Sequence, residues 1–407
     1  MDRDWVLHVF ETISGFSRGE HGITRLALSE EELRARGYVV GLMQELGMKI
    51  RVDGIGNIIG RLEGTDPAAA PVIVGSHLDS VPEGGRYDGV LGVVGGLAAI
   101  RRIQATEHSQ HPLELIIFTA EESSRFGFAT MGSKAMAGVP DIKAWSKAKD
   151  QQGISFLEAL AAAGLPTDDI GSASRVGEPI QAFVELHIEQ GPVLEDEELE
   201  IGIVEAIAAP TRLKIKVEGT PGHSGTTPMH TREDALVTAA QIVLAVREVA
   251  LSRYEDGTVG TVGNLKVYPG VMNVIPGIVE MWVDIRGVSH ESIVETLQEL
   301  KDEISIIAEA EGTTISIEVL TSDKPVKLHP MVINAVEEAC KDLKVSYMRM
   351  NSGAGHDAMH MASIGPAGMI FIPCASGISH NPEESAAPAD IMRGIDVLTR
   401  TLRKLAE

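Results

Sequence analysis

Histidine and carboxylate side chains recur at the ends of four short apolar runs in this sequence. In α/β proteins the residues that follow buried parallel strands meet at one edge of the sheet, where ligand sites form. Three histidines and at least two carboxylates are therefore expected to converge there. They are His77 and Asp88 after the run 71–75, Glu121 and Glu122 after 113–119, His187 within 182–188, and His380 after 368–373.

Imidazole and carboxylate groups together are typical ligands of zinc, manganese, cobalt or nickel, and five of them with one carboxylate shared suffice for two ions. A single histidine near a strand end is usually an ordinary hydrogen-bonded residue, but four separate strand ends that each deliver a ligand type favour a metal centre. Asp79, two residues from His77, is expected to hold the imidazole tautomer. Glu121 and Glu122 are either a solvated acidic pair or a ligand beside a general base.

The apolar runs themselves predict the strands that position these residues. Uninterrupted runs of this length indicate strands covered on both faces, as in a mostly parallel sheet. They alternate with helical patterns, and Ser29 with Glu32 forms a capping-box pattern at the first of these. The alternation predicts an α/β catalytic domain. Its helical patterns lie at about 29–46, 89–104, 330–343 and from 388 onward.

A different pattern begins near residue 209. The stretches 211–218 and 314–319 alternate apolar with polar residues, which is typical of half-buried strands. Two long helical stretches and a further strand lie between them, so an antiparallel α+β sandwich is expected as an insertion at 210–325. The catalytic domain is then discontinuous, over 1–209 and 326–407. The helical stretches are 232–252 and 289–311, and the strand is 277–286.

Composition excludes several classes of function. The 407 residues carry 35 basic and 58 acidic side chains, a net charge of −23 that would repel nucleic acid and anionic lipid. The two cysteines, Cys340 and Cys374, lack the spacing of a thiolate zinc site, and they suit a reducing cytoplasm. The start of the chain does not have the pattern of a signal peptide, and no apolar run is long enough to predict a membrane span.

Several long motifs carry a resemblance that covers nearly the whole chain in order. They are GSHLDSVPEGGRYDGVLGVVGG, FTAEESSRFG, VELHIEQGPVLE, HSGTTPM, NVIPG, SGAGHDA and GISHNPEE. Together they resemble the hydantoinase/carbamoylase branch of the dinuclear-metal aminoacylase and carboxypeptidase family. That branch includes N-carbamoyl-L-amino acid hydrolases, allantoate amidohydrolases and β-ureidopropionases.

The resemblance implies a centre of two divalent metal ions, which would be zinc, manganese, cobalt or nickel. Carried over position by position, it makes Glu121 the general base and Asp88 the ligand shared by both ions. The remaining ligands that it implies are Glu122 and His380 for one ion, and His77 and His187 for the other.

The resemblance also implies that the inserted domain is a lid that carries a homodimer interface and part of the substrate site. His223, Asn273 and Arg286 match positions that bind the substrate's carboxylate or its reacting carbonyl, and Gln190 matches a further contact. Arginine offers a planar fork for a carboxylate, and a histidine donor can stabilise an oxyanion. From spacing alone Arg286 is a strand-end surface residue, and His223 and Asn273 are turn residues. His356 is either a substrate contact or part of a tight structural turn.

The function expected from these residues is metal-dependent hydrolysis of the ureido amide of an N-carbamoyl-L-amino acid, giving the amino acid, carbon dioxide and ammonia. Allantoate, an N-acyl amino acid or a dipeptide are the alternative substrates on the same centre. The segment 209–212 reads Ala-Pro-Thr-Arg, which departs from the Gly-Gln-Arg-Arg pattern of allantoate enzymes and favours carbamoyl amino acids. A silent binding protein is disfavoured because no ligand position is missing. The expected partners are a small carboxylate substrate and a second copy of the chain.

Overall fold

The computed structural model describes residues 2–106 and 109–407, and these divide into two compact units. Unit 1 comprises residues 1–205, 328–352 and 356–407, and unit 2 comprises 206–327 and 353–355. The insertion expected at 210–325 lies within unit 2. The short segment 353–355 returns to unit 2 from a later part of the chain, because it contacts the strand that carries Arg286.

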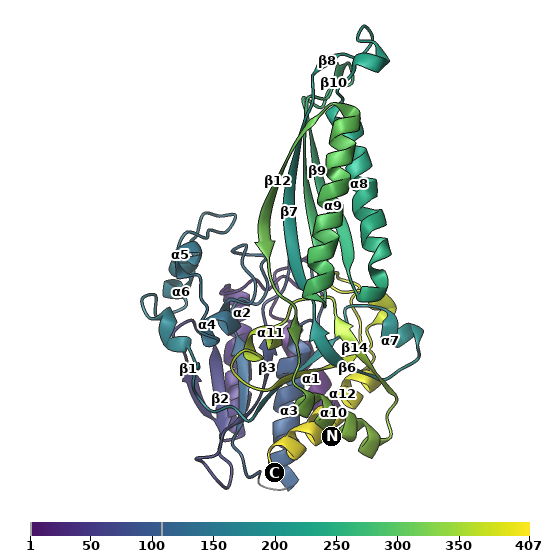
Figure 1. The fold of residues 1–407 in the computed structure, drawn as a ribbon. Helices are drawn as coiled ribbons and strands as arrows, with labels where there is room; N and C mark the ends of the chain where they lie inside the picture. The colour runs from purple at the N-terminus through teal and green to yellow at the C-terminus, as the bar shows by residue number, and fades with distance from the viewer. Residues whose placement is uncertain (1, 107–108) are drawn as a thin grey trace. The chain divides into compact units, whose positions relative to one another are not determined.

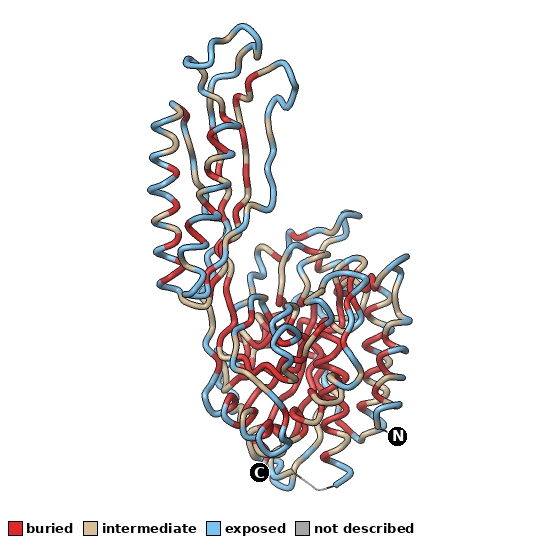
Figure 2. The backbone as a smooth tube through the Cα atoms, turned by 90° about the vertical axis from the view of Figure 1, so that its right-hand side faces the viewer, coloured by how far each residue is buried: buried red, intermediate tan, exposed pale blue. Residues whose placement is uncertain are grey.

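Unit 1 is built around a mixed sheet (Figure 1), in which strand pairing is parallel at the centre and antiparallel toward both edges. Four central strands are parallel, and they are the four apolar runs found in the sequence. Figure 2 shows the buried backbone concentrated in this unit's interior. The strand order is β1 (Lys49–Val52), β2 (Ile58–Leu62), β4 (Leu113–Phe118), β3 (Val72–His77), β5 (Ala182–Ile188), β15 (Ala367–Ile372) and β6 (Ile201–Ile207), with β14 (Tyr347–Ser352) paired to β6. β13 (Val326–Lys327) pairs with the last two residues of β6, which belong to unit 2.

The antiparallel edge strands were not predicted from the sequence. β1 pairs with β2 and β2 with β4 at one edge, and β6 pairs with β15 at the other, all antiparallel. β1 is mostly exposed, and polar or glycine residues interrupt the apolar pattern of β2. The expected parallel arrangement therefore holds for the strands that lie at the centre and are buried along their whole length.

Helices cover the sheet, and the chain just before one of them brings Asp88 to the sheet edge. The helix that follows β3 contains three glycines, at 92, 95 and 96, whose added Cβ atoms would meet Ser76, Leu186 and Val74 at less than 3 Å. The helix can therefore lie close against the strands. The helices of unit 1 are α1 (Asp2–Ser14), α2 (Glu30–Glu45), α3 (Val90–Thr106), α4 (Met131–Met136), α5 (Ile142–Trp145), α6 (Phe156–Ala162), α7 (Val193–Asp196), α10 (Pro330–Leu343), α11 (Ala358–Met361) and α12 (Pro388–Leu405).

The predicted cap of α2 forms only in part. The Ser29 side chain accepts a hydrogen bond from the Glu32 backbone N–H, as expected. The Glu32 carboxylate, however, accepts from the Leu28 backbone N–H and pairs with the buried guanidinium of Arg36. The reciprocal bond to Ser29 is therefore replaced by a buried ion pair that joins α2 to the end of β4, because Arg36 also donates to the Phe118 carbonyl.

Unit 2 is an antiparallel sheet with two helices packed against it, and Figure 1 shows the paired helices beside the long strands. Alternate residues of β11 are buried, and their side chains form a core with the helices. A separate two-stranded ladder lies beyond one end of the long strands. The elements are β12 (Thr314–Ser322), β7 (Ala209–Glu218), β11 (Ile278–Gly287) and β9 (Val259–Tyr268) in sheet order, α8 (Ala235–Ser252), α9 (His290–Glu311), and the ladder β8 (Gly222–His223) with β10 (Val274–Ile275).

Among the described residues, α8 is the one helix that has the length and composition needed to cross a membrane. Its buried residues include Thr238, Ile242 and Val246, and α8 packs on β9 and β11. A helix that buries one face in this way is typical of a protein core.

Candidate active site

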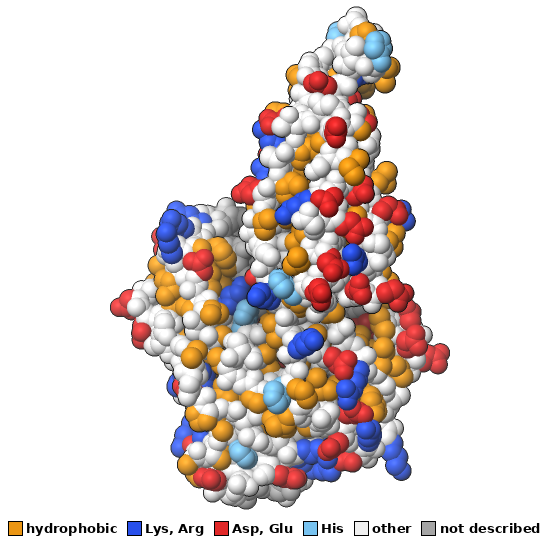
Figure 3. All heavy atoms as spheres, in the orientation of Figure 1, with side chains coloured by type: hydrophobic (Ala, Val, Ile, Leu, Met, Phe, Trp, Pro, Cys, Tyr) orange, Lys and Arg blue, Asp and Glu red, His pale blue; other side chains and the backbone are white. Residues whose placement is uncertain are grey.

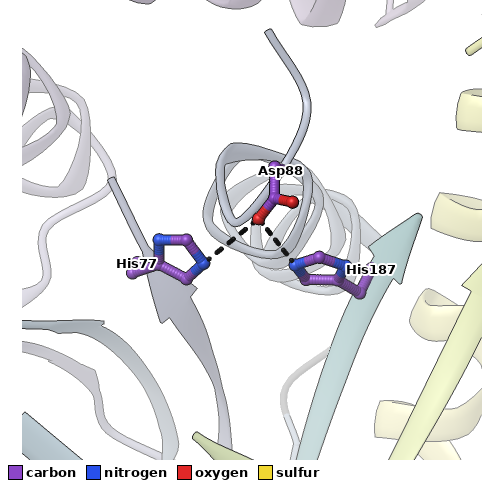
Figure 4. A group of neighbouring side chains, drawn as sticks. All are labelled: His77, Asp88 and His187. Atoms are coloured by element: carbon purple, nitrogen blue, oxygen red, sulfur yellow. Dashed lines mark ion pairs between the residues drawn. The ribbon is translucent and has the colours of Figure 1, made fainter. Parts of the chain in front are cut away.

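His77, Asp88 and His187 come from separate elements and point toward one another at the sheet edge (Figure 4). His77 is the last residue of β3, His187 lies near the end of β5, and Asp88 comes two residues before α3. The Asp88 Oδ1 atom is 3.5 Å from His77 Nε2 and 3.4 Å from His187 Nε2. All three side chains are buried. This group could hold one metal ion.

A second group uses the other oxygen of the same aspartate. Asp88 Oδ2 is 3.4 Å from His380 Nε2, and that nitrogen is 3.2 Å from Glu122 Oε1. The ligand atoms of each group lie within 4.8 Å of one another. Asp88 therefore faces two candidate cation positions, with one carboxylate oxygen toward each.

The tautomers of the two buried histidines fit a metal site. His77 Nδ1 is 2.9 Å from the main-chain carbonyl oxygen of Asp79, and His187 Nδ1 is 2.9 Å from that of Ile188. A carbonyl oxygen can only accept, so each Nδ1 carries a hydrogen, and Nε2 is the nitrogen of each ring that remains available to a metal ion beside Asp88. Neutral imidazole with a free Nε2 is a common form of a histidine metal ligand.

The expected role of the Asp79 carboxylate was wrong in its detail. The carbonyl of Asp79 orients His77, whereas its carboxylate lies 3.8 Å from the same nitrogen. The carboxylate instead accepts the backbone N–H groups of Glu121 at 3.3 Å and Glu122 at 3.0 Å. Burial raises the pKa of Asp79 to about 6. Asp79 thus joins the end of β3 to the turn that presents both glutamates.

Glu121 and Glu122 are not a solvated pair, because their side chains are 11% and 10% exposed. Glu121 Oε2 lies 3.7 Å from His77 Nε2, beside the first ligand group. Burial raises the pKa of the Glu121 carboxyl well above its ordinary value, with a further contribution from Glu122 and against the opposing effect of His77. A carboxyl with a raised pKa at a reaction centre is suited to take up and return a proton.

The electrostatics of the cluster favour bound positive charge. Hydrogen bonds to Asp88 and Glu122 raise the pKa of His380 to about 10. Burial opposes protonation of His77, yet Glu121 and Asp88 raise the pKa of His77 well above its ordinary value. The same negative potential and the N/O donor set fit a divalent transition metal ion.

Two kinds of contributing residue were missed from the sequence. Gly89 has φ of 68°, and an added Cβ would lie 2.4 Å from the His77 ring, so only glycine lets α3 begin there. Ser379 and Glu384 lie next to Asp88 through hydrogen bonds. The glycine could have been suspected because it follows a candidate ligand at a helix start. Glu384 could not be distinguished from its neighbour Glu383.

Gln190 and His356 both lie against the ligand groups. Gln190 donates from Nε2 to Asp88 Oδ2 at 2.6 Å. The buried ring of His356 packs edge-on against His187, with centroids 4.7 Å apart, and its Nε2 is 2.8 Å from Ser352 Oγ. Burial lowers the pKa of His356 well below its ordinary value, so its ring is neutral.

The three candidate residues of unit 2 lie in two places. Val274 of β10 pairs with His223 in β8, and the Ser224 N–H donates to the carbonyl of Asn273, so His223 and Asn273 are neighbours. Arg286 lies near the other end of β11, where Asp284 pairs with its guanidinium through two bonds of 3.2 Å. Eight residue steps separate Ile278 from Arg286 on β11, or roughly 26 Å at about 3.3 Å per residue.

The sequence pattern of peptidase family M20/M25/M40 matches residues 73–404. The chain belongs to this family. Among curated relatives of this M20/M25/M40 protein, N-carbamoyl-L-amino acid amidohydrolase of Geobacillus stearothermophilus is 42% identical, covering 95% of this chain and 94% of that protein. Ureidoglycolate hydrolase of Oryza sativa is 38% identical over 100% and 85%, and allantoate amidohydrolase of Escherichia coli is 34% identical over 95% and 93%.

A solved structure agrees with this assignment. A hydantoinase/carbamoylase family amidase from Burkholderia multivorans has a TM-score of 0.93 and 36% identity, covering 99% of this chain and 98% of that one. The resemblance found in the motifs is therefore confirmed. The M20/M25/M40 protein described here is an amidohydrolase of the carbamoylase and allantoate amidohydrolase group.

Proposed function

We propose that this amidohydrolase hydrolyses the ureido amide of N-carbamoyl-L-amino acids at a centre of two divalent metal ions. The observation that carries the proposal is the position of Asp88, which faces two ligand groups with one oxygen each, beside the buried Glu121. The ions would be zinc, manganese, cobalt or nickel, because the donors are imidazole and carboxylate. His77 and His187 would hold one ion, and Glu122 and His380 the other, with Asp88 shared.

Each residue has a role that follows from its position. Divalent ions in these groups would lower the pKa of water and polarise the substrate carbonyl. Glu121 takes the proton of the attacking water and returns it to the leaving nitrogen, as its raised pKa allows. His223 donates to the oxyanion, and Arg286 binds the substrate carboxylate. Gln190 positions Asp88, and His356 supports His187 or contacts the substrate.

The substrate class follows from chemistry shared by the relatives. N-carbamoyl amino acids, allantoate and ureidoglycolate all have a ureido group and a carboxylate on one carbon, and they differ in a further substituent of that carbon. That substituent is a side chain, a second ureido group or a hydroxyl. The segment 209–212 lacks the Gly-Gln-Arg-Arg pattern and favours a carbamoyl amino acid. Allantoate and ureidoglycolate are the alternative substrates.

The buried free thiols of Cys340 and Cys374 suit the cytoplasm.

A homodimer through unit 2 would complete the substrate site. The length of β11 from Ile278 to Arg286, roughly 26 Å, separates the end of unit 2 near His223 from Arg286, and a small ureido acid cannot span it. If His223 and Arg286 both bind it, one of them comes from a second copy, and Asn273 comes with His223. Apolar side chains are exposed on unit 2, where they lie among acidic ones in Figure 3. On α8 they recur every seven residues, at Val237, Leu244 and Leu251, as in a helix-packing stripe.

Ammonia release tests the proposal. The metal-loaded protein is incubated with N-carbamoyl-L-amino acids, allantoate, ureidoglycolate and N-carbamoyl-β-alanine, and ammonia is measured over time. We expect the highest kcat/KM for an N-carbamoyl-L-amino acid, and a much lower value when its carboxylate is replaced by a carboxamide. Preference for allantoate or ureidoglycolate would transfer the assignment to that substrate. Turnover of none of the ureido acids, with N-acyl amino acids or dipeptides cleaved, would refute the ureido specificity.

A further inference from the structure

A buried glutamate outside both ligand groups contacts the backbone of the shared ligand. Glu384 follows β15 and α12 begins four residues later, and it is 4% exposed. Its Oε1 atom accepts the backbone N–H of Tyr87 at 2.9 Å and that of Asp88 at 3.2 Å. These bonds fix the chain just before α3, where Asp88 must turn both oxygens toward the two groups.

The other oxygen of Glu384 contacts the loop that carries the ligand His380. Ser379 Oγ lies 3.0 Å from Glu384 Oε2 and 2.9 Å from Asp88 Oδ2. Ser379 immediately precedes His380, which has a φ of 55°. Ser379 therefore bridges two carboxylates, so one network holds the side chain of Asp88, its backbone and the position of His380.

The chain around Glu384 is shaped to contain it. A Cβ added to Gly85 would lie 2.0 Å from the Glu384 carboxyl carbon and 2.4 Å from its Cβ, so a side chain there would displace the glutamate. The neighbouring Glu383 is exposed and provides a matched comparison in the same segment. A carboxylate taken out of water must be stabilised by its hydrogen bonds, and here the bonds named lead to Asp88, to its neighbour Tyr87 and to Ser379 beside His380.

We propose that Glu384 is a positioning residue of the metal centre, which fixes Asp88 and the His380 loop so that the second ligand group is formed before the ion binds. The inference rests on the proposed metal centre. Hydrogen-bond partners of ligands typically change metal affinity by roughly 10- to 100-fold when they are removed. A residue that merely fills space would change stability and leave the affinity of the metal-free protein for the ion unaltered.

Zinc competition tests this without any substrate. The metal-free full-length protein is titrated with Zn²⁺ against a chromophoric chelator, for wild type, Glu384→Ala, Glu384→Gln and the control Glu383→Gln. We expect two Zn²⁺ per wild-type chain, and one of them bound roughly 10- to 100-fold more weakly by Glu384→Ala. Glu384→Gln should keep most of the affinity, since its amide oxygen can still accept the two N–H groups and its nitrogen can donate to Ser379. Glu383→Gln should match wild type.

Ser379→Ala gives a second route if Glu384→Ala does not fold. It removes one hydroxyl from a partly exposed position and should weaken the same Zn²⁺ site. Wild-type affinity for both ions in the folded Ala variants, or equal weakening in Glu383→Gln, overturns the positioning role. Wild-type protein that binds no Zn²⁺ would instead remove the metal centre and the proposed function together. Wild type that binds two ions and cleaves ureido acids, while Ser379→Ala binds them equally well, refutes this inference alone.

Discussion

One variant carries Glu121→Ala and a second carries His223→Ala, and each alone is expected to be nearly inactive. When the two variants exchange subunits, the mixed dimers are expected to regain activity. Loss of a general base typically lowers a rate by about 10²- to 10⁴-fold, and loss of an oxyanion donor by about 10²- to 10³-fold. The prediction rests on unit 2, where His223 and Arg286 are separated by most of the length of β11. One chain cannot bring both of them to a small substrate.

The size of the recovery follows from two-fold symmetry. In a mixed dimer, the subunit with an intact Glu121 receives an intact His223 from its neighbour, and the other site lacks both groups. Random exchange makes about half of the dimers mixed, so one complete site in each gives about a quarter of wild-type activity. If His223 serves its own subunit, neither site of a mixed dimer is complete.

The assay needs proof that exchange occurred. The two variants carry different affinity tags, mixed dimers are isolated by sequential capture, and ammonia release is measured before and after mixing. A second mixture gives the matched control. Wild type mixed equally with the Glu121→Ala/His223→Ala double variant should keep about a quarter of full activity for a shared site, but about half for self-contained sites. Inactive mixed dimers in the first mixture, with half activity in the second, would refute the supply of His223 by the partner subunit.

Three further predictions concern unit 1 and the arginine of unit 2. Chelation should abolish ammonia release, and manganese, cobalt, nickel or zinc should restore it, since the ligand groups need metal to activate water. Full activity in verified metal-free protein would refute the metal-dependent mechanism. Glu121→Gln should keep both ions and lose roughly 10²-fold or more in kcat. If Glu121→Gln instead loses metal while Glu122→Gln keeps it, the roles of general base and metal ligand are reversed between the two residues. Arg286→Lys should lose about 1.5 to 3 kcal/mol of carboxylate binding, seen as a raised KM; unchanged KM, or equal turnover of acid and carboxamide by wild type, would exclude Arg286 from the site.

The elements predicted from the sequence are those with a strong and uninterrupted period. The four buried central strands and the helices α8, α9, α10 and α12 stand where their patterns placed them, within a few residues. The missed elements lack such a period. β9 is an edge strand with most residues exposed and with glycines at 260 and 263, so no face of it is uniformly apolar. α1 is the exception, because its buried residues Val6, Val9, Phe10 and Ile13 do recur at helical spacing, and this short pattern at the start of the chain was overlooked.

The candidate ligands could be predicted because each of them follows or lies within a strand that is visible as an apolar run in the sequence. Because neighbouring parallel strands end at the same edge of the sheet, the topology then brings these residues together. Residues that act through backbone contacts give no such indication. Asp79 orients His77 by its carbonyl, which every residue has, and Glu384 is one of two adjacent glutamates. Arg286 is expected to act with Asn273 on a carboxylate, but Asn273 lies beside the β8–β10 ladder, and most of the length of β11 separates that ladder from Arg286 in one chain.

The loops that carry the site hold non-glycine residues in the left-handed region of the backbone. The φ angles are 51° at Ala120, which precedes Glu121, 58° at Gln190, which contacts Asp88, and 55° at the candidate ligand His380. This conformation costs about 1 kcal/mol or more per residue, so other contacts must stabilise it. The Met131 N–H bonds to the Ala120 carbonyl, and Gln190 bonds to Asp88. Because these contacts lie within the protein, the fold itself contributes to holding the mutually repelling carboxylates of the site close together.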